Sequence, residues 1–571
     1  MKFYRHLLPV TLVAALYSVA TPATADDAAE RILYNARIFT GEPDRPYAEA
    51  LAIRGDKIVA VGNRDEMAKA VGRNVQSVDL HGKWLFPGFI DSHSHSISGG
   101  ISLISADVSD KVQTMDELVG FAAEAKKSGK GMVGDTLSIT GVPLMFWSKI
   151  DELNSRFSGG IFRDQPVFLA GMDYHTGWAN RALLRRTEIT KDFLNRLPEA
   201  DRKYYGANSN LEPNGFVVDA GLRKVQAHLP PPTSDQLLQA GHAALQYNHS
   251  LGITSWLDPI VDESTLATYS KLAERGELTA HVAGFVQVYA HNPAEELANV
   301  QRLRQQFKDV PNLTVPGVKI FADGVVEFPS QTATLSKPYR NSGKNGELLF
   351  DPALFAQLAI AADKQGLIVH VHAIGDQAVK EALNGIEAAR KANGNSGLPH
   401  TITHVQFVDP EDFPRFHQMG VIAALQLLWA SAGPDSIEIV KPYVDPDIYQ
   451  RQYPARSLLD NGAIISGASD WPVSTANVFL AIYQAETRRG PEGVLDASQR
   501  MPREAMLYAY TRNSARAMNL QDTIGSIAAD KQADLVLLDR DVLTVSAEEL
   551  KDTKILWTMV GGKTVYQGAT K

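Results

Sequence analysis

The chain has 571 residues, a formal net charge of −9 at pH 7 and no cysteine. An acidic balance without a basic block argues against nucleic acid as a partner, and the lack of cysteine excludes disulfide bonds and a thiol nucleophile. With 44% hydrophobic and 21% charged residues, the composition is typical of a globular enzyme, and the length allows a large core and more than one structural unit.

Residues 1–25 have the features of a secretory signal peptide. A basic start, "MKFYRH", precedes the apolar stretch "LLPVTLVAALYSVA", and "ATA" before Asp26 fits a small-residue cleavage site. The alternative is a membrane anchor, but this stretch is short for a span and contains Pro9 and Thr11. We therefore expect cleavage after Ala25, a secreted or periplasmic bacterial protein, and no membrane association after cleavage.

Residues 26–85 and 520–571 share a pattern of short alternating strands and turns. The N-terminal part contains "RILYNARIFTG" and "ALAIRGDKIVAVG", and the C-terminal part contains "DLVLLDRD" and "ILWTMVGGKTVYQG". Two distant β segments of the same kind predict one small β-sandwich that is built from both chain ends.

Residues 86–519 alternate apolar, strand-like runs with amphipathic helical patterns. Eight such runs are candidate strands, the first starting slightly earlier: 84–90, 252–258, 280–288, 315–322, 366–373, 400–407, 420–428 and 463–469. Eight βα units predict an α/β fold, the (β/α)8 TIM barrel, whose active site lies at the carboxyl ends of the strands. The first gap is too long for one crossover, so we expect an inserted subdomain at about residues 105–232.

Side chains that bind metals recur at the ends of these predicted strands. His93 and His95 end the first run in "DSHSH", and residues i and i+2 of a strand point to the same face. Such a pair alone is weak, because two exposed histidines are usually just solvated. However, His372, His404 and Asp470 end three further strands, and imidazoles and carboxylates suit zinc and similar divalent ions.

Lys319, in "VKIFADG", lies in a strand that the barrel should bury. A buried ammonium is costly unless it is paired, and burial favours the neutral amine. A neutral amine can take up carbon dioxide to become a carbamate, an anion that can bridge two cations. The alternative is an ion pair with Asp323 or another acid, and the residues alone leave the two readings even.

With these motifs in order, the chain resembles the metal-dependent amidohydrolase superfamily, in the family 3 branch related to N-substituted formamide deformylase. The resemblance extends from about Ile32 to Gln567 and rests on "PGFIDSHSH", "DYHTGWANRALL", "GVKIFADGVVEFPSQTATLSKPY", "HVHAIGDQAV", "ITHVQFVDPED", "GASDWPV" and "GSIAADKQADLVLLDRD". It implies a barrel with an appended β-sandwich and one or two divalent ions, with zinc as the expected metal. The implied ligands are His93, His95, carboxylated Lys319, His372, His404 and Asp470.

Three further residues are candidates for substrate contact. His175 and Trp178 lie in "DYHTGWANRALL", whose family counterpart borders the mouth of the active site, and Trp429 follows the seventh strand. For each of them a packing role is the alternative. His370 shares a strand face with His372 but lies one layer deeper, so we expect a hydrogen-bonded core histidine there rather than a ligand.

The predicted function is hydrolysis of a non-peptide amide C–N bond in a small N-acyl or N-formyl compound. Metal-bound hydroxide would attack the carbonyl, and Asp470 would accept the proton of the water and return it to the leaving nitrogen. An esterase, lactonase or cyclic amidase on the same metal centre is one alternative, and a non-catalytic metal-containing binding protein is another. The expected partner is a small-molecule substrate, and a homo-oligomer is left open.

Overall fold

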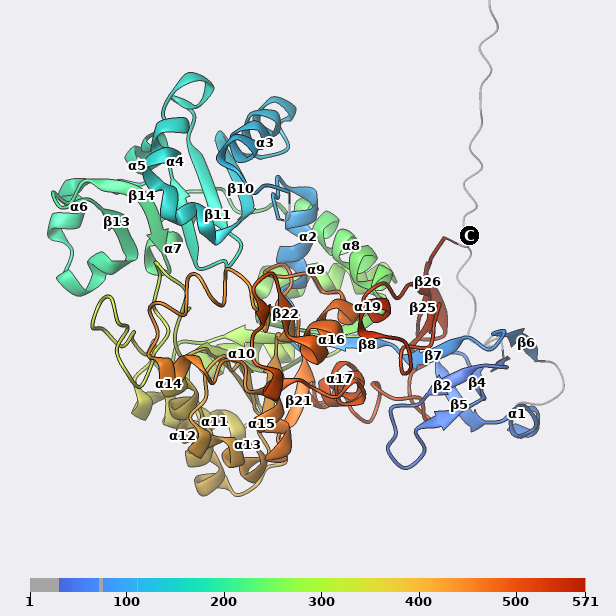
Figure 1. The fold of residues 1–571 in the computed structure, drawn as a ribbon. Coiled ribbons are helices and arrows are strands. Elements are labelled where there is room, and N and C mark those ends of the chain that lie inside the picture. Colours follow the sequence, from blue (N-terminus) through green and yellow to red (C-terminus); the bar gives the residue numbers. More distant parts are fainter. Residues whose placement is uncertain (1–29, 71–74, 110, 570–571) are drawn as a thin grey trace, which may run out of the picture.

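The computed structural model describes residues 30–70, 75–109 and 111–569 (Figure 1). The predicted signal peptide lies outside these residues. Within the described ranges, none of the helices combines the length and the apolar character that a membrane span requires.

The centre of the molecule is an eight-stranded parallel sheet that curls into a nearly closed barrel, as predicted. Its order, β21-β20-β19-β18-β17-β16-β15-β8, follows the sequence from one edge to the other. The strands are β8 (Phe89–Asp91), β15 (Ile253–Val261), β16 (His281–Gln287), β17 (Leu313–Phe321), β18 (Ile368–Ala373), β19 (Thr401–His404), β20 (Ile422–Leu425) and β21 (Ile464–Gly467). At the seam between the first and last strands, Ser92 N–H donates to the Gly467 carbonyl at 3.0 Å.

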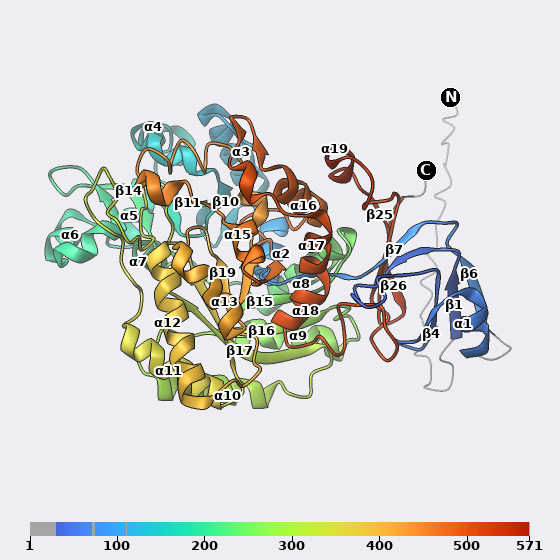
Figure 2. The same cartoon turned by 60° about the horizontal axis from the view of Figure 1, so that its bottom comes forward.

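Helices follow the barrel strands and cover the outside of the sheet (Figures 1 and 2). They include α2 (Ser96–Ile104), α8 (Ser234–Ser250), α9 (Glu263–Glu274), α10 (Pro293–Gln306), α11 (Pro352–Lys364), α12 (Asp376–Asn393), α13 (Phe413–Met419), α15 (Ala455–Asp460) and α16 (Val478–Thr487). In α12, the buried residues Val379, Leu383 and Ile386 recur at helical spacing, so one apolar stripe faces the sheet. This alternation of strand and helix places the carboxyl ends of all eight strands on one face.

The first predicted strand, residues 84–90, is wrong as a single barrel strand. The chain divides at Gly88 into β7 (Trp84–Pro87), which pairs with β24 (Leu535–Leu538), and β8, which enters the barrel. A Cβ on Gly88 would lie 2.2 Å from the hydroxyl oxygen of Thr254. Only glycine therefore fits where the chain crosses from one sheet to the other.

Strands from the two distant chain segments form two further sheets. One has the order β5-β4-β1-β6, and the other has the order β26-β25-β24-β7-β2-β3. Their strands are β1 (Glu30–Tyr34), β2 (Arg37–Phe39), β3 (Tyr47–Ala48), β4 (Ala50–Arg54), β5 (Lys57–Gly62), β6 (Gln76–Asp79), β7, β24, β25 (Ile555–Val560) and β26 (Lys563–Gln567). Leu33 and Leu51 of the first sheet share one buried cluster with Leu85, Leu535 and Leu537 of the second. Figure 2 shows the N-terminal strands in blue beside the C-terminal strands in red.

A six-stranded sheet forms between the first two barrel strands, in the region where an insertion is expected. Its order is β13-β14-β12-β11-β10-β9, with β9 (Met132–Val133), β10 (Thr136–Val142), β11 (Val167–Gly171), β12 (Thr176–Ala179), β13 (Tyr205–Ala207) and β14 (Pro213–Val218). Leu137, Ile139, Phe146 and Trp147 belong to a hydrophobic cluster of its own. In Figure 1 these strands and their helices, in cyan, lie to one side of the barrel.

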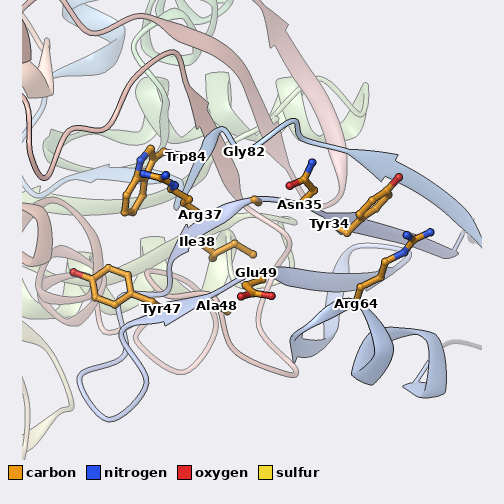
Figure 3. Close-up of a pocket in the computed structure, with 11 residues that line it drawn as sticks. Tyr34, Asn35, Arg37, Ile38, Tyr47, Ala48, Glu49, Arg64, Gly82 and Trp84 are labelled. Carbon is orange, nitrogen blue, oxygen red and sulfur yellow. The ribbon is translucent and has the colours of Figure 1, made fainter.

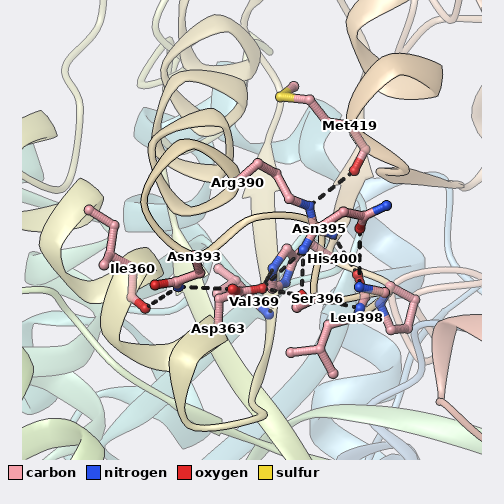
Figure 4. A network of polar contacts seen from close by, with 12 residues as sticks. Ile360, Asp363, Val369, Arg390, Asn393, Asn395, Ser396, Leu398, His400 and Met419 are labelled. Carbon is pink, nitrogen blue, oxygen red and sulfur yellow. Dashed lines mark hydrogen bonds and ion pairs between the residues drawn. The ribbon is translucent and has the colours of Figure 1, made fainter.

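A polar network lies near the amino ends of β18 and β19, opposite to the carboxyl ends of the barrel strands (Figure 4). The buried carboxylate of Asp363 accepts hydrogen bonds from Arg390, Asn393 and Ser396, and its Oδ1 lies 2.9 Å from His400 Nε2. Val369 N–H donates to His400 Nδ1 at 3.0 Å. Nδ1 is therefore unprotonated, and the His400 proton sits on Nε2, from which it is donated to Asp363. Every partner in this network is satisfied, which stabilises the scaffold below the candidate site.

Candidate metal centre

Four strand ends bring the predicted histidines and the aspartate into one cluster. Asp470 Oδ1 lies 3.2 Å from His93 Nε2 and 3.1 Å from His95 Nε2. Ligand atoms of His93, His404 and Asp470 all lie within 4.8 Å of one another. The rings of His372 and His404 are 4.5 Å apart between centroids. Residues from β8, β18, β19 and β21 thus meet at one point, where three of them can hold a metal ion together.

The backbone turns sharply at two of these strand ends. His404 has a φ of 73°, Val405 of 50° and Asp470 of 58°, in the left-handed region that non-glycine residues rarely adopt. Hydrogen bonds hold these turns, since Asp470 N–H donates to the His93 carbonyl at 2.8 Å and Val405 N–H donates to the Ala373 carbonyl at 3.0 Å. Such conformations cost about 1–3 kcal/mol each and concentrate at functional sites.

Three of the clustered imidazoles, those of His93, His372 and His404, have one nitrogen engaged by the protein, which turns the other toward the centre. His93 Nδ1 is joined to His370 Nε2 at 2.7 Å, and His404 Nδ1 lies 3.1 Å from Gln426 Oε1. His372 Nε2 donates to the Gly324 carbonyl at 3.0 Å. Partners of this kind fix the orientation of histidine ligands in metal sites. His370 is therefore a buried, hydrogen-bonded histidine behind the centre.

The charges in the cluster also fit a bound cation. Burial lowers the pKa values of His93, His372 and His404 well below the usual value, although the charge of Asp470 opposes this effect at His404. These imidazoles are therefore neutral, the form that binds metals. Asp470 Oδ1 is buried and makes no hydrogen bond of good geometry. Burial acts to raise the pKa of Asp470, but the neighbouring histidines and lysine outweigh it and lower the pKa. A buried carboxylate oxygen facing neutral imidazoles suits a divalent ion.

Lys319 lies in β17 and lines the same cavity as the clustered residues. Its side chain is 1% exposed, and burial lowers the pKa of its amine to about 7, although the charge of Asp470 acts in the opposite direction. Over the described ranges, the amine has no ion-pair partner within 4 Å. The carboxylate of Asp323 instead accepts the backbone N–H groups of Thr334, Ile374 and Gly375. The structure thus does not contain the ion pair that was the alternative reading of Lys319.

Asp91, which precedes the two histidines, was not predicted as a site residue. Its Oδ1 accepts the N–H groups of His93 at 3.2 Å and Ser469 at 3.0 Å, and its Oδ2 accepts the Ser469 hydroxyl. Burial raises the pKa of Asp91 to about 7. This carboxyl therefore links the loops that carry His93 and Asp470. In the sequence, the acid in "FIDSHSH" could have indicated this role, because an acid buried in a strand needs hydrogen-bond partners.

The cluster opens into a cavity of about 760 Å3. His175 and Trp429 line it, and the Trp429 ring is nearly parallel to that of His404, with 5.6 Å between centroids. His175 Nδ1 lies 2.8 Å from Asp219 Oδ1. Burial lowers the pKa of His175, but the bond with Asp219 outweighs it and raises the pKa to about 9. His175 is therefore an imidazolium at neutral pH.

Trp178 does not reach this cavity, so its predicted substrate contact is wrong. Its side chain is 0% exposed and packs in the cluster of the six-stranded sheet, where its Nε1 donates to the Asn214 carbonyl at 3.1 Å. The position at which β12 starts explains the difference from His175. His175 lies in the loop before the strand, whereas Trp178 lies inside it and faces the sheet's own core.

A second hollow, of about 800 Å3, lies on the terminal sheets (Figure 3). Tyr34, Arg37, Tyr47, Arg64 and Trp84 line it. Among the residues described, the group of three or more side chains that could share a metal ion is His93, His404 and Asp470, and none of them lies in this hollow. The catalytic candidate is therefore the cavity at the strand ends.

Comparison with known proteins gives a consistent result. A model of the amidohydrolase family matches residues 76–566. The chain is 28% identical to Protein LONG AFTER FAR-RED 3 of Arabidopsis thaliana, over 99% of this chain and 96% of that protein. It is 22% identical to N-substituted formamide deformylase of Arthrobacter pascens, over 94% and 98% of the two chains. Among solved structures, an uncharacterized metal-dependent hydrolase from Pyrococcus horikoshii is similar, with 25% identity, a TM-score of 0.69, and coverage of 91% of this chain and 99% of that one.

Proposed function

The chain belongs to the amidohydrolase family, and from this membership we propose that it hydrolyses a non-peptide amide C–N bond in a small N-acyl or N-formyl compound. Membership of this family makes the protein a metal-dependent hydrolase that acts on a small molecule. The finer substrate class is supported by the similarity to N-substituted formamide deformylase along almost the whole of both chains.

The proposed metal ligands are His93, His95, His372, His404 and Asp470, together with Lys319 as a carbamate. Zinc is the proposed ion, in one or two copies, because imidazole and carboxylate ligands suit it. Support for the carbamate comes from the burial of Lys319 and from its lowered pKa, since only a neutral amine can react with carbon dioxide. When bound, such an ion lowers the pKa of water to about 7 and polarises a carbonyl.

In this proposal Asp470 moves the proton of the reaction. Its carboxylate would accept a proton from the attacking water and return it to the leaving nitrogen. His175, held by Asp219 Oδ1 at 2.8 Å, would donate a hydrogen bond to the substrate from its other ring nitrogen. Trp429, stacked on His404, would form a flat apolar wall. The observation that carries the proposal is the convergence of three strand ends, those of β8, β19 and β21, on a group of ligand atoms around Asp470.

Two rival functions remain, and one experiment separates them from the proposal. Purified protein would be loaded with zinc, and its metal content measured. It would then be given N-(2-phenylethyl)formamide, the matching acetamide, the matching formate ester and a six-membered lactone. Turnover of the amides at the highest kcat/KM supports the proposal. Preference for the ester or the lactone favours the first rival, and bound zinc without turnover favours a binding protein.

The domain organisation completes the proposal. We assign residues 26–85 and 520–571 to one β-sandwich, supported by the cluster that their sheets share. Residues 86–519 would form the barrel domain, with an inserted subdomain at about 105–232 that is supported by the separate six-stranded sheet. Secretion or a periplasmic location is proposed from the N-terminal sequence alone.

A further inference from the structure

One part of the cavity wall is strongly acidic and has no role in the proposed chemistry. Asp173 comes from the loop between β11 and β12, Glu327 from the loop after β17, and Asp435 from the loop after β20. All three line the same cavity as the clustered histidines, and so does Tyr453. These four residues are called the acidic subsite below.

The three carboxyl groups lie close enough to repel one another. Burial, together with the charges of Asp435 and Asp173, raises the pKa of Glu327 to about 7, although the charge of His175 acts in the opposite direction. Burial and the charge of Asp173 likewise raise the pKa of Asp435. Groups of one sign that face each other in this way cost stability, so a cation between them would be favoured.

No protein cation forms an ion pair with the three acids in the part of the chain that the structure describes. None of the three carboxylates has an ion-pair partner within 4 Å there, and Asp173 Oδ2 is buried without any hydrogen-bond partner. The positive charge of His175 acts to lower the pKa values of Asp173 and Glu327, but His175 is itself paired with Asp219 at 2.8 Å, so one imidazolium is shared among several acids. Arg223 lines the cavity too, but it forms no ion pair with the three acids.

Tyr453 gives an independent sign that something binds here. Its side chain is only 6% exposed, and its hydroxyl has no hydrogen-bond partner among the described residues. The charges of Glu327 and Asp435 act on this hydroxyl, because after burial they are the main causes of its raised pKa. The backbone is fixed, since Tyr453 N–H donates to the Gln406 carbonyl at 2.7 Å and buried Arg488 donates to the Tyr453 carbonyl at 3.1 Å. A rigid aromatic ring beside carboxylates is a usual environment for a bound ammonium group.

We propose that the acidic subsite binds a positively charged group of the substrate, so that the enzyme acts on small amides that carry a primary ammonium some distance from the scissile carbonyl. The proposal rests on the proposed amide hydrolysis for the position of the carbonyl, and on the subsite for the charge. Apolar side chains such as Leu144, Val288 and Phe321 line the same cavity and would contact a methylene chain. Charge-assisted hydrogen bonds to carboxylates would supply the selectivity.

The test compares substrates that differ only in this charge. N-(ω-aminoalkyl)formamides with two to six methylenes would be paired with N-alkylformamides in which a methyl group replaces the ammonium. Binding to metal-free protein would be measured by calorimetry, and kcat/KM would be measured on the zinc-loaded protein. For the best spacer, we expect the ammonium compound to bind at least about tenfold more tightly than its neutral pair.

Variants then locate the effect. Glu327→Gln and Asp435→Asn keep the shape and remove a repelling charge, so both should fold, and each should reduce the preference about tenfold or more. Tyr453→Phe should reduce it less, because only the hydroxyl is lost. Glu124→Gln, on an exposed helix outside the cavity, is the matched control and should leave the preference unchanged.

The two hypotheses fail in different ways. Hydrolysis of charged and neutral formamides with equal kcat/KM, and equal binding by the metal-free protein, would overturn the subsite and leave the proposed function standing. Selective binding of the ammonium compounds without any turnover would overturn amide hydrolysis and support the subsite. Binding of Ca2+ that Glu327→Gln abolishes, with no selectivity for any ammonium, would identify a metal site instead and refute the proposal.

Discussion

Replacement of His370 by phenylalanine should weaken metal binding without unfolding the barrel. His93 and His370 are 1% and 0% exposed, and their ring nitrogens are 2.7 Å apart. When His93 Nε2 binds a metal, the remaining proton of its ring is on Nδ1 and is donated to His370 Nε2. Phenylalanine keeps a ring of similar size but removes the acceptor. The N–H of His93 is then buried and unsatisfied only in the metal-bound form.

The size of the effect follows from that single lost acceptor. An unsatisfied buried donor costs about 1–3 kcal/mol, which at about 1.4 kcal/mol per tenfold is roughly a five- to 150-fold loss of metal affinity. The metal-free protein loses less, because His93 can move its proton to Nε2, where Asp470 Oδ1 lies 3.2 Å away. Phenylalanine also removes the His370 Nδ1 atom, which is buried without a partner.

A competition titration of zinc against a chelator would measure this loss, and urea unfolding of the metal-free variant would monitor the fold. His370→Gln is the matched control, since its amide oxygen can accept the His93 proton and should preserve most of the affinity. Equal zinc affinity of wild type and His370→Phe, in a folded variant, would refute the assigned tautomer and the role of His93 Nε2.

Four further outcomes are expected. Asp470→Asn should retain much of its metal while turnover falls by roughly two orders of magnitude or more, and near-normal turnover would remove Asp470 as the proton acceptor. Lys319→Ala should lose metal and activity, and propionate should restore part of both, whereas full metal occupancy by elemental analysis would contradict the carbamate. Asp363→Ala should lower the free energy of unfolding by about 3–5 kcal/mol at pH 7, because it leaves part-buried Arg390 and buried His400 without their shared carboxylate. Burial would raise the pKa of Asp363, but its hydrogen bonds outweigh burial and lower the pKa. The stability of the wild type should therefore fall as the pH drops below about 4. In urea unfolding, the difference in free energy of unfolding between wild type and Asp363→Ala should become smaller over the same pH range. Exported protein should begin at Asp26, and an intact mass that includes Met1 would contradict leader cleavage.

The barrel could be predicted because each of its strands is recognisable from a short stretch of sequence. Each strand is an apolar run, and the chemistry sits at the end of the run, where a parallel sheet brings all ends to one face. His93, His372, His404 and Asp470 were therefore found from the residues themselves. His370 was separated from them by its register, two residues deeper in β18. Burial of Lys319 was likewise predictable, because it lies inside a strand of the barrel.

The parts that were missed depend on contacts between distant segments. The division of residues 84–90 into two strands at Gly88 depends on Thr254 and on a partner strand near Leu537. The pattern of residues 84–90 itself does not indicate either contact. Trp178 and His175 share a motif, but the position of the strand start sends one into a core and the other into the cavity. Asp173, Glu327 and Asp435 come from three separate loops, and a single acid in a loop has no distinguishing pattern.

The pairing of β7 with β24 has a consequence for how the protein is made. Leu85 lies opposite Leu537, so β7, which is synthesised early and pairs with β2 on one side, must wait for almost the whole chain before its neighbour on the other side exists. Until then β7 presents an open edge, and unpaired edges of this kind promote aggregation. Completion of the sheet that contains β7 must therefore wait until β24 has been synthesised, and it is at this stage that a chaperone would be most useful to the chain.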